Sequence, residues 1–237
     1  EMIKLAMATD KAVVSLNKAT GAGTQFVAEI ASMSPRMSAA NVSVGELGKT
    51  YGSLITKFLA FNKLNDQQRA GIIETTSILS ELGVGLDTTS DNFNILMTSF
   101  KMTSEEAGRF QREMLVIAQE SLIPPDVMAE GFKDALPQLA AFGKQATSVY
   151  AKLAVNAKAA SMSTQEVLKI TEKFDRFDTA ADSVGKLNAI LGGPYLSTTK
   201  MIRQTDPTER IRMLSDAAAD AGKSFDSMQY FERKSWP

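Results

Sequence analysis

The fold of this chain is decided by residues 44–61, which read VGELGKTYGSLITKFLAF. Apolar side chains recur there at alternating spacings of 3 and 4 residues, and they are Val44, Leu47, Tyr51, Leu54, Phe58 and Phe61. This spacing places them all on one side of an α-helix. Two interpretations are open. The segment is either an amphipathic helix packed on its own domain, or a coiled-coil-like seam over 44–61 that meets another chain.

Helix start signals recur outside this segment. Residues 65–68 (NDQQ), 103–106 (TSEE) and 163–166 (STQE) fit capping boxes, in which a short polar side chain and a residue three positions later satisfy early backbone N–H groups. Residues 124–126 (PPD) and 206–209 (DPTE) place proline at the first helical position, where its missing N–H costs nothing. These signals predict serial helix starts.

Helix stop signals follow the apolar runs. They are glycines at 83, 85, 143, 192–193 and 222. Period-2 strand patterns are almost missing, so we predict an all-α fold of many short to medium helices. The expected ranges are 1–20, 24–33, 44–63, 66–82, 88–100, 104–120, 125–142, 144–160, 164–175, 178–191, 197–203, 207–221 and 225–235. A loop is expected around residues 32–35 (SMSP).

The charge distribution suggests a division near residue 65. Residues 1–65 carry 7 basic and 4 acidic residues, and residues 66–237 carry 19 and 23, so the parts have charges of +3 and −4. We expect an extended helical lead-in over 1–65, followed by a compact multi-helix domain over 66–237. Residues 101–106 resemble 161–166, but this similarity does not recur at a fixed period, so the sequence predicts no regular repeat array.

Composition excludes several classes of chemistry. The 237 residues are 44% apolar, have a net charge of −1, and include neither cysteine nor histidine. Disulfides, thiol nucleophiles, zinc fingers and histidine-based triads are therefore excluded. The near-zero net charge disfavours a strongly basic nucleic-acid binder. The longest uncharged stretch is 187–199, too short to span a bilayer. The chain begins with Glu1 and ends at Pro237, and we expect a piece of a longer or processed polypeptide.

Two acidic features are candidate sites. Four carboxylates at helical spacing could hold a hard cation, and they are Glu172, Asp175, Asp178 and Asp182. Basic residues are interleaved with them, which favours a solvated helix face. Residues 119–121 (QES) resemble the start of a lytic transglycosylase site, in which Glu120 would be the general acid. The following residues lack that family's continuation, so we expect no catalytic residue, no metal ligand and no cofactor.

Three other features have structural and functional interpretations. Residues 191–195 (LGGPY) indicate a helix stop and turn, or a contact loop exposing Tyr195. Lys200, Arg203, Arg210 and Arg212 form a basic cluster that acidic residues interrupt, with nucleic-acid contact as the lesser alternative. The 12 methionines suit adaptable core packing or an adaptable interface. Residues 224–234 are expected to form a capped docking helix.

The stretch from about residue 82 to 234 resembles the tail tape-measure proteins of tailed bacteriophages, particularly contractile-tailed marine and cyanobacterial phages. The segments that carry the resemblance are 132–143 (FKDALPQLAAFG), 174–185 (FDRFDTAADSVG), 187–193 (LNAILGG) and 206–211 (DPTERI). The family offers no catalytic residues.

The resemblance implies a structural protein of the virion tail, made in the host cytoplasm, that sets tail length and leaves with the DNA at ejection. Its expected partners are tail-tube and baseplate-hub proteins, and itself. No small-molecule substrate, specific nucleic acid or membrane span is expected. Two alternatives remain: a helical adaptor or scaffolding protein outside phage biology, and a peptidoglycan-cleaving tail enzyme that uses Glu120.

Overall fold

A computed structural model describes residues 2–22 and 25–223, and the side chains from residue 7 onward within those ranges. The predicted all-α class is confirmed, because the described residues form helices and no strand. The chain divides into two compact units, residues 1–136 and 137–237. The expected helix at 225–235 lies outside the described residues.

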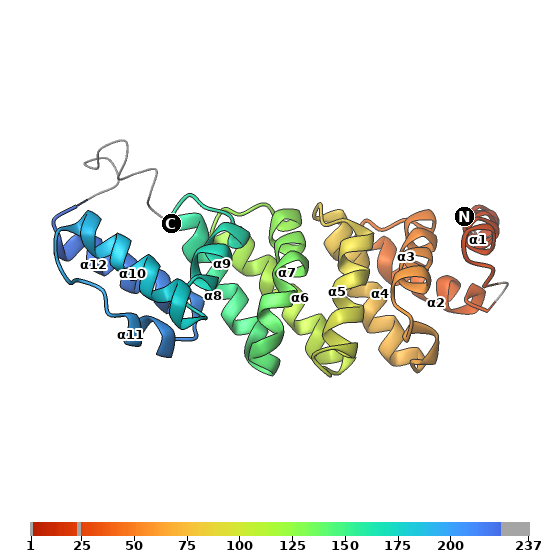
Figure 1. The fold of residues 1–237 in the computed structure, drawn as a ribbon. Coiled ribbons are helices and arrows are strands. Elements are labelled where there is room, and N and C mark those ends of the chain that lie inside the picture. The colour runs from red at the N-terminus through yellow and green to blue at the C-terminus, as the bar shows by residue number, and fades with distance from the viewer. Residues whose placement is uncertain (1, 23–24, 224–237) are drawn as a thin grey trace. The chain divides into compact units, whose positions relative to one another are not determined.

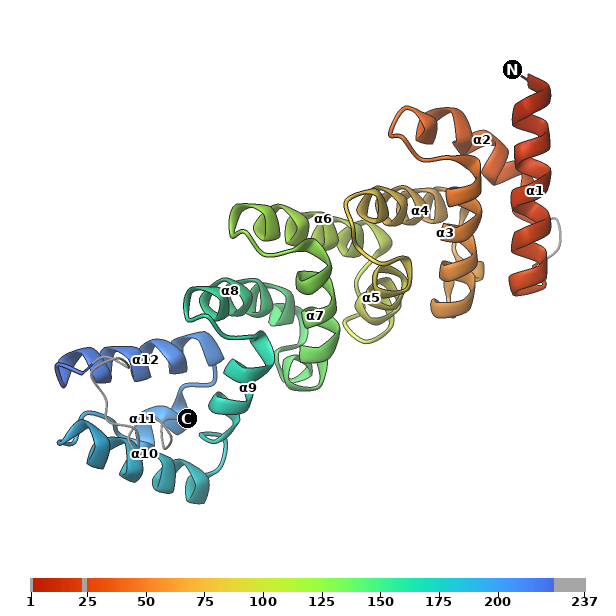
Figure 2. The same ribbon diagram turned by 90° about the horizontal axis from the view of Figure 1, so that it is seen from above.

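The first unit contains the helices α1 (Met2–Thr20), α2 (Val27–Ser38), α3 (Val44–Lys57), α4 (Asp66–Glu81), α5 (Leu86–Thr98), α6 (Ser104–Glu120) and most of α7 (Pro125–Leu139), with a short 3-10 helix at Phe61–Lys63. Their main contacts connect alternate helices, so α1, α3 and α5 form one layer and α2, α4 and α6 another (Figures 1 and 2). Two-layer stacking therefore arises without the fixed sequence period that usually reveals it.

The second unit begins within α7. It contains a 3-10 helix at Ala140–Gln145 and the helices α8 (Ala146–Ala159), α9 (Thr164–Glu172), α10 (Phe177–Leu191), α11 (Thr198–Arg203) and α12 (Pro207–Asp220). Helices α8, α9 and α12 contact one another, and α10 contacts α11. One core cluster is formed by Phe174, Ala180, Val184, Leu187, Leu191, Leu196, Met201, Leu214 and Ala217.

The division predicted near residue 65 differs from the observed one. Helices α3 and α4, on either side of that residue, are in contact, and α2 also contacts α4. An ion pair joins Glu29 of α2 to Arg69 of α4. Residues 1–65 therefore pack in the same unit as residues up to 136, and the charge difference between the two sequence segments does not mark a boundary.

The apolar stripe of residues 44–61 packs inside its own unit. Leu47, Tyr51 and Leu54 are fully buried. The Tyr51 ring lies 5.3 Å from the Phe26 ring and 6.2 Å from the Phe61 ring, measured between centroids. These side chains are covered by other parts of the same unit, which supports packing within its own domain over a coiled-coil-like seam. The expected single helix over 44–63 is wrong, because α3 ends at Lys57, Phe58 is extended, and Phe61 lies in the short 3-10 helix.

The expected loop around residues 32–35 is wrong, because α2 continues through Pro35 to Ser38. Proline removes one backbone N–H and usually disrupts a helix interior. Here Met33 and Met37 are buried on either side of the exposed Pro35. Tertiary packing of these methionines therefore outweighs the local preference to end the helix.

The predicted capping boxes are confirmed at Asn65, Thr103 and Ser163, where each side chain accepts a hydrogen bond from the N–H three residues later. A fourth box, Ser43 with Glu46, starts α3 and was not predicted. Asp206 caps α12 by accepting from the Thr208 N–H at 2.8 Å. These contacts fix the point at which each helix begins.

One type of helix end recurs along the chain. A residue with positive φ ends the helix, and the next N–H bonds a carbonyl five residues earlier, as in a Schellman motif. The positive-φ residues in such ends are Asn41, Gly83, Leu122, Ser161, Gly192 and Gly222. In four of them the residue that follows is a buried or half-buried Val, Ile or Met, namely Val42, Val84, Ile123 and Met162. Gly85 begins α5 instead of ending α4.

Candidate functional site

The four acidic residues considered as a cation site are all exposed, and three of them pair with nearby basic groups. Asp178 pairs with Arg176, Asp182 pairs with Lys186, and Asp175 pairs with Arg210. Within the described ranges, no group of three or more acidic side chains could hold a metal ion. Glu172 ends α9, Asp175 lies in the linker, and Asp178 and Asp182 belong to α10, so the four are solvated surface carboxylates with local ion pairs and do not share one helix face.

Glu120 is the last residue of α6, and its side chain is exposed. A general acid for glycoside cleavage needs a raised pKa, which a buried apolar setting provides. The exposed end of a helix does not supply that setting. The structure therefore gives no support to Glu120 as a catalytic acid.

The basic cluster near the C-terminus does not form one exposed patch. Arg210 is 4% exposed, and its guanidinium donates to the carbonyl oxygens of Thr171 at 2.7 Å and Met201 at 3.2 Å. It also donates to the Phe174 and Gln204 carbonyls and pairs with Asp175. Arg210 thus satisfies carbonyls at the ends of α9 and α11, where helices lack internal donors. It cannot contact a nucleic acid from this position.

The loop after α10 is confirmed as a helix stop. Gly192 has a φ of 82°, the left-handed conformation that glycine adopts without strain. The Asn188 side chain then holds the loop, because its amide donates to the Leu196 carbonyl at 2.9 Å and accepts from the Leu196 N–H at 2.8 Å. Tyr195 remains 42% exposed on this fixed loop.

A buried polar network in the first unit was not predicted. Arg69, 8% exposed, donates to the Glu29 carboxylate, which also accepts from the Tyr51 hydroxyl at 3.1 Å. Burial, followed by the Glu29 charge, raises the pKa of Tyr51 well above its ordinary value. The hydrogen bond to Glu29 raises the pKa of Arg69. This network joins α2, α3 and α4 and leaves no free group for chemistry.

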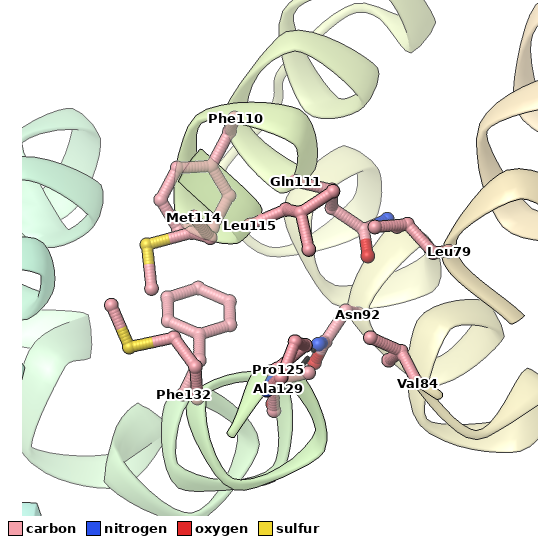
Figure 3. Close-up of a pocket in the computed structure, with 11 residues that line it drawn as sticks. Leu79, Val84, Asn92, Phe110, Gln111, Met114, Leu115, Pro125, Ala129 and Phe132 are labelled. Carbon is pink, nitrogen blue, oxygen red and sulfur yellow. Dashed lines mark hydrogen bonds between the residues drawn. The ribbon is translucent and has the colours of Figure 1, made fainter. Parts of the chain in front are cut away.

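A small cavity of about 20 Å³ lies between α4, α5, α6 and α7, which is room for about one water molecule (Figure 3). Its lining is mostly apolar and includes Leu79, Val84, Phe110, Met114, Pro125 and Phe132. The two polar lining side chains are Asn92 and Gln111, and the Asn92 amide points toward Ala129 (Figure 3). The cavity is too small for an organic substrate.

The Asn92 amide is only partly satisfied within this cavity. Its nitrogen donates to the Ala129 carbonyl at 3.1 Å, which leaves the amide oxygen buried without a hydrogen-bond partner. The Gln111 nitrogen donates to the Thr89 carbonyl at 3.5 Å. The two amides therefore link α5, α6 and α7 and have a structural role.

The cavity also shows which chain segments are neighbours. Val84 lies in the linker between α4 and α5, and Pro125 follows the linker between α6 and α7, and both line the cavity (Figure 3). The linkers 82–85 and 121–124 therefore lie beside each other at one edge of the first unit. This edge carries the exposed apolar residues Leu82 and Leu122.

No helix among the described residues is long and apolar enough to cross a lipid bilayer. Comparisons of the chain with models of protein families, with curated proteins and with solved structures find no match.

Proposed function

We propose that this chain is a structural, non-enzymatic protein of the tail tape-measure type, working in phage tail assembly, length determination and DNA ejection. It acts by helix–helix contacts with itself or with tail-tube and baseplate-hub proteins. The observation that carries the proposal is the serial arrangement of capped helices joined by similar helix ends. Such a chain devotes its polar side chains to fixing helix ends and its apolar side chains to packing helices.

The layered packing suggests which portion of such a protein this chain represents. A helix advances about 1.5 Å per residue, so a continuous helix converts chain length into distance. Helices stacked side by side, as α1, α3 and α5 are, do not add their lengths in this way. We therefore assign the chain to a folded helical portion and not to an extended ruler.

Mass spectrometry of purified tails tests this proposal. We expect peptides from both units at a constant ratio to the tail-tube protein. Tails that lack these peptides would contradict the proposal.

A helical adaptor or scaffolding protein outside phage biology is the second candidate. The two-layer stack of α1 to α6 favours it, since stacked helix pairs commonly form extended binding surfaces. The complete open reading frame discriminates between the two candidates, because a tape-measure protein continues for hundreds of helical residues.

The peptidoglycan-cleaving alternative depends on Glu120. If it is correct, the purified chain clears a cell-wall suspension and Glu120→Gln abolishes the clearing. An inactive wild-type chain excludes this activity for the 237 residues.

A further inference from the structure

We propose that the edge of the first unit around Leu122 is a docking surface for a basic amphipathic segment of a partner protein. The inference goes beyond the proposed function and does not depend on it. It rests on an exposed leucine in a strained backbone conformation, on its apolar neighbours and on the acidic residues around them.

Leu122 departs from local preferences in two ways. Its φ is 54°, a left-handed conformation in which a side chain with a Cβ atom is strained. Its side chain is also 81% exposed. The other non-glycine residues with positive φ are the polar Asn41, Lys101 and Ser161 among the described residues. Leucine at position 122 therefore strains the backbone, and its exposed side chain gains little burial in the folded chain to offset that strain.

The surrounding backbone holds Leu122 in place. The Ser121 N–H bonds the Ile117 carbonyl at 2.9 Å, and the Ile123 N–H bonds the Ala118 carbonyl at 2.8 Å. Ile123 is buried, so it supplies the apolar contact of this helix end and Leu122 does not. The following Pro124 and Pro125 have fixed φ angles. The leucine is presented on a rigid support, which lowers the entropic cost of binding.

Two further exposed apolar residues belong to the elements next to Leu122. Val127 in the first turn of α7 is 53% exposed, and Leu82 at the end of α4 is 43% exposed. Leu82 belongs to the linker beside that of Leu122, because Val84 and Pro125 line one cavity (Figure 3). These side chains supply the apolar part of the docking surface.

The acidic residues at this edge indicate which kind of partner segment it would bind. The exposed residues Glu81, Glu120 and Asp126 flank the apolar side chains. Residues 113–132 contain four acidic residues and no basic residue. In residues 70–100 the acidic residues Glu74, Asp87 and Asp91 pair with Arg36, Lys57 and Lys133, so Glu81 is the one that adds to the rim. An apolar centre with an acidic rim complements a segment with leucine-like residues on one face and Lys or Arg beside them. A second copy of this acidic edge would be repelled.

Fluorescence anisotropy with the complete chain tests the proposal. The probe is a labelled amphipathic helical peptide of leucine and lysine, and the matched control peptide contains leucine and glutamate. We expect the lysine peptide to bind more tightly than the glutamate peptide, with an affinity that falls as salt is added. Equal binding of the two peptides would overturn the proposal.

Leu122→Gly separates binding from folding. Glycine relieves the strain, so we expect a melting temperature that is unchanged or raised by about 2–4 °C. Peptide affinity should fall about tenfold or more, because the buried leucine contact is lost. Leu59→Gly removes a leucine that is 83% exposed in another linker and should leave the affinity unchanged.

The double variant Glu120→Gln, Asp126→Asn should lower the affinity and flatten its salt dependence. Unchanged binding by Leu122→Gly, or equal losses for Leu122→Gly and Leu59→Gly, would overturn the proposal. Light scattering on the unliganded chain gives a further test. A dimer that Leu122→Gly dissociates would show that the edge binds a second copy, and it would also overturn the proposal.

Discussion

Replacing Arg210 by methionine should destabilise the second unit far more than replacing an exposed charged residue does. The guanidinium is 4% exposed and donates to carbonyl oxygens of four residues, which lie at the ends of α9 and α11. A hydrogen bond from a charged donor contributes about 1.5–3 kcal/mol. If two of these hydrogen bonds are lost without replacement, and the apolar packing of methionine offsets part of the loss, the free energy of unfolding falls by about 3–4 kcal/mol. Arg210→Lys should recover only part of this loss, because an ammonium lacks the planar fork.

Arg212→Met is the matched control, because Arg212 lies on the same helix but is exposed and pairs with Glu209 and Asp216. Urea unfolding followed by circular dichroism gives the free energies, and hydrogen exchange locates the change. We expect lost protection in residues 164–220 and unchanged protection in the first unit. The reasoning fails if Arg210→Met costs no more than Arg212→Met, or if the first unit loses protection instead.

Three further predictions concern ionisation and helix packing. The pKa of Tyr51 is raised above its ordinary value of 10.0, so the folded chain keeps the Tyr51 proton at a pH where the unfolded chain has lost it. The folded state therefore loses stability as the pH rises above about 10. Tyr51→Phe should reduce this alkaline loss in melting curves measured at different pH values. The hydrogen bonds from Ser163 lower the pKa of Glu166 below its ordinary 4.5, so that stability falls on acidification below that pH, and Glu166→Gln should flatten the acid limb of the same curves. A Cβ at Gly48 would lie 3.1 Å from the Ala12 Cβ, so Gly48→Leu should lower the melting temperature by separating α1 from α3, whereas Gly71→Ala in open space should raise stability by about 0.5–1 kcal/mol.

Helix starts were predictable because their signals are local. At Asn65, Thr103 and Ser163, the capping side chain and its partner lie within four residues, so the sequence contains the complete interaction. The box at Ser43 has the same pattern, and a search for Ser or Thr followed three residues later by Glu would have found it. The loop that the sequence predicts at Pro35 does not form, because burial of Met33 and Met37 against distant segments outweighs the local effect of proline.

Burial of charged groups was not predictable from the sequence. Arg69 meets Glu29 across 40 positions, and Arg210 meets Thr171 across 39. No local pattern distinguishes these arginines from the exposed Arg212, and only the tertiary structure does. The left-handed conformation of Leu122 was not predictable either, because glycine and asparagine are the residues that usually indicate a left-handed helix end.

Because each helix of the first unit packs mainly on helices close to it in chain order, the unit should unfold stepwise under tension. Its principal contacts join helices no more than two positions apart in chain order. Such low contact order favours rapid folding. A pull on the chain ends would therefore detach helices one after another, and each could re-form its contacts with the adjacent helix once tension was released. The unit would respond as an extensible spring and not as a body that ruptures in a single step.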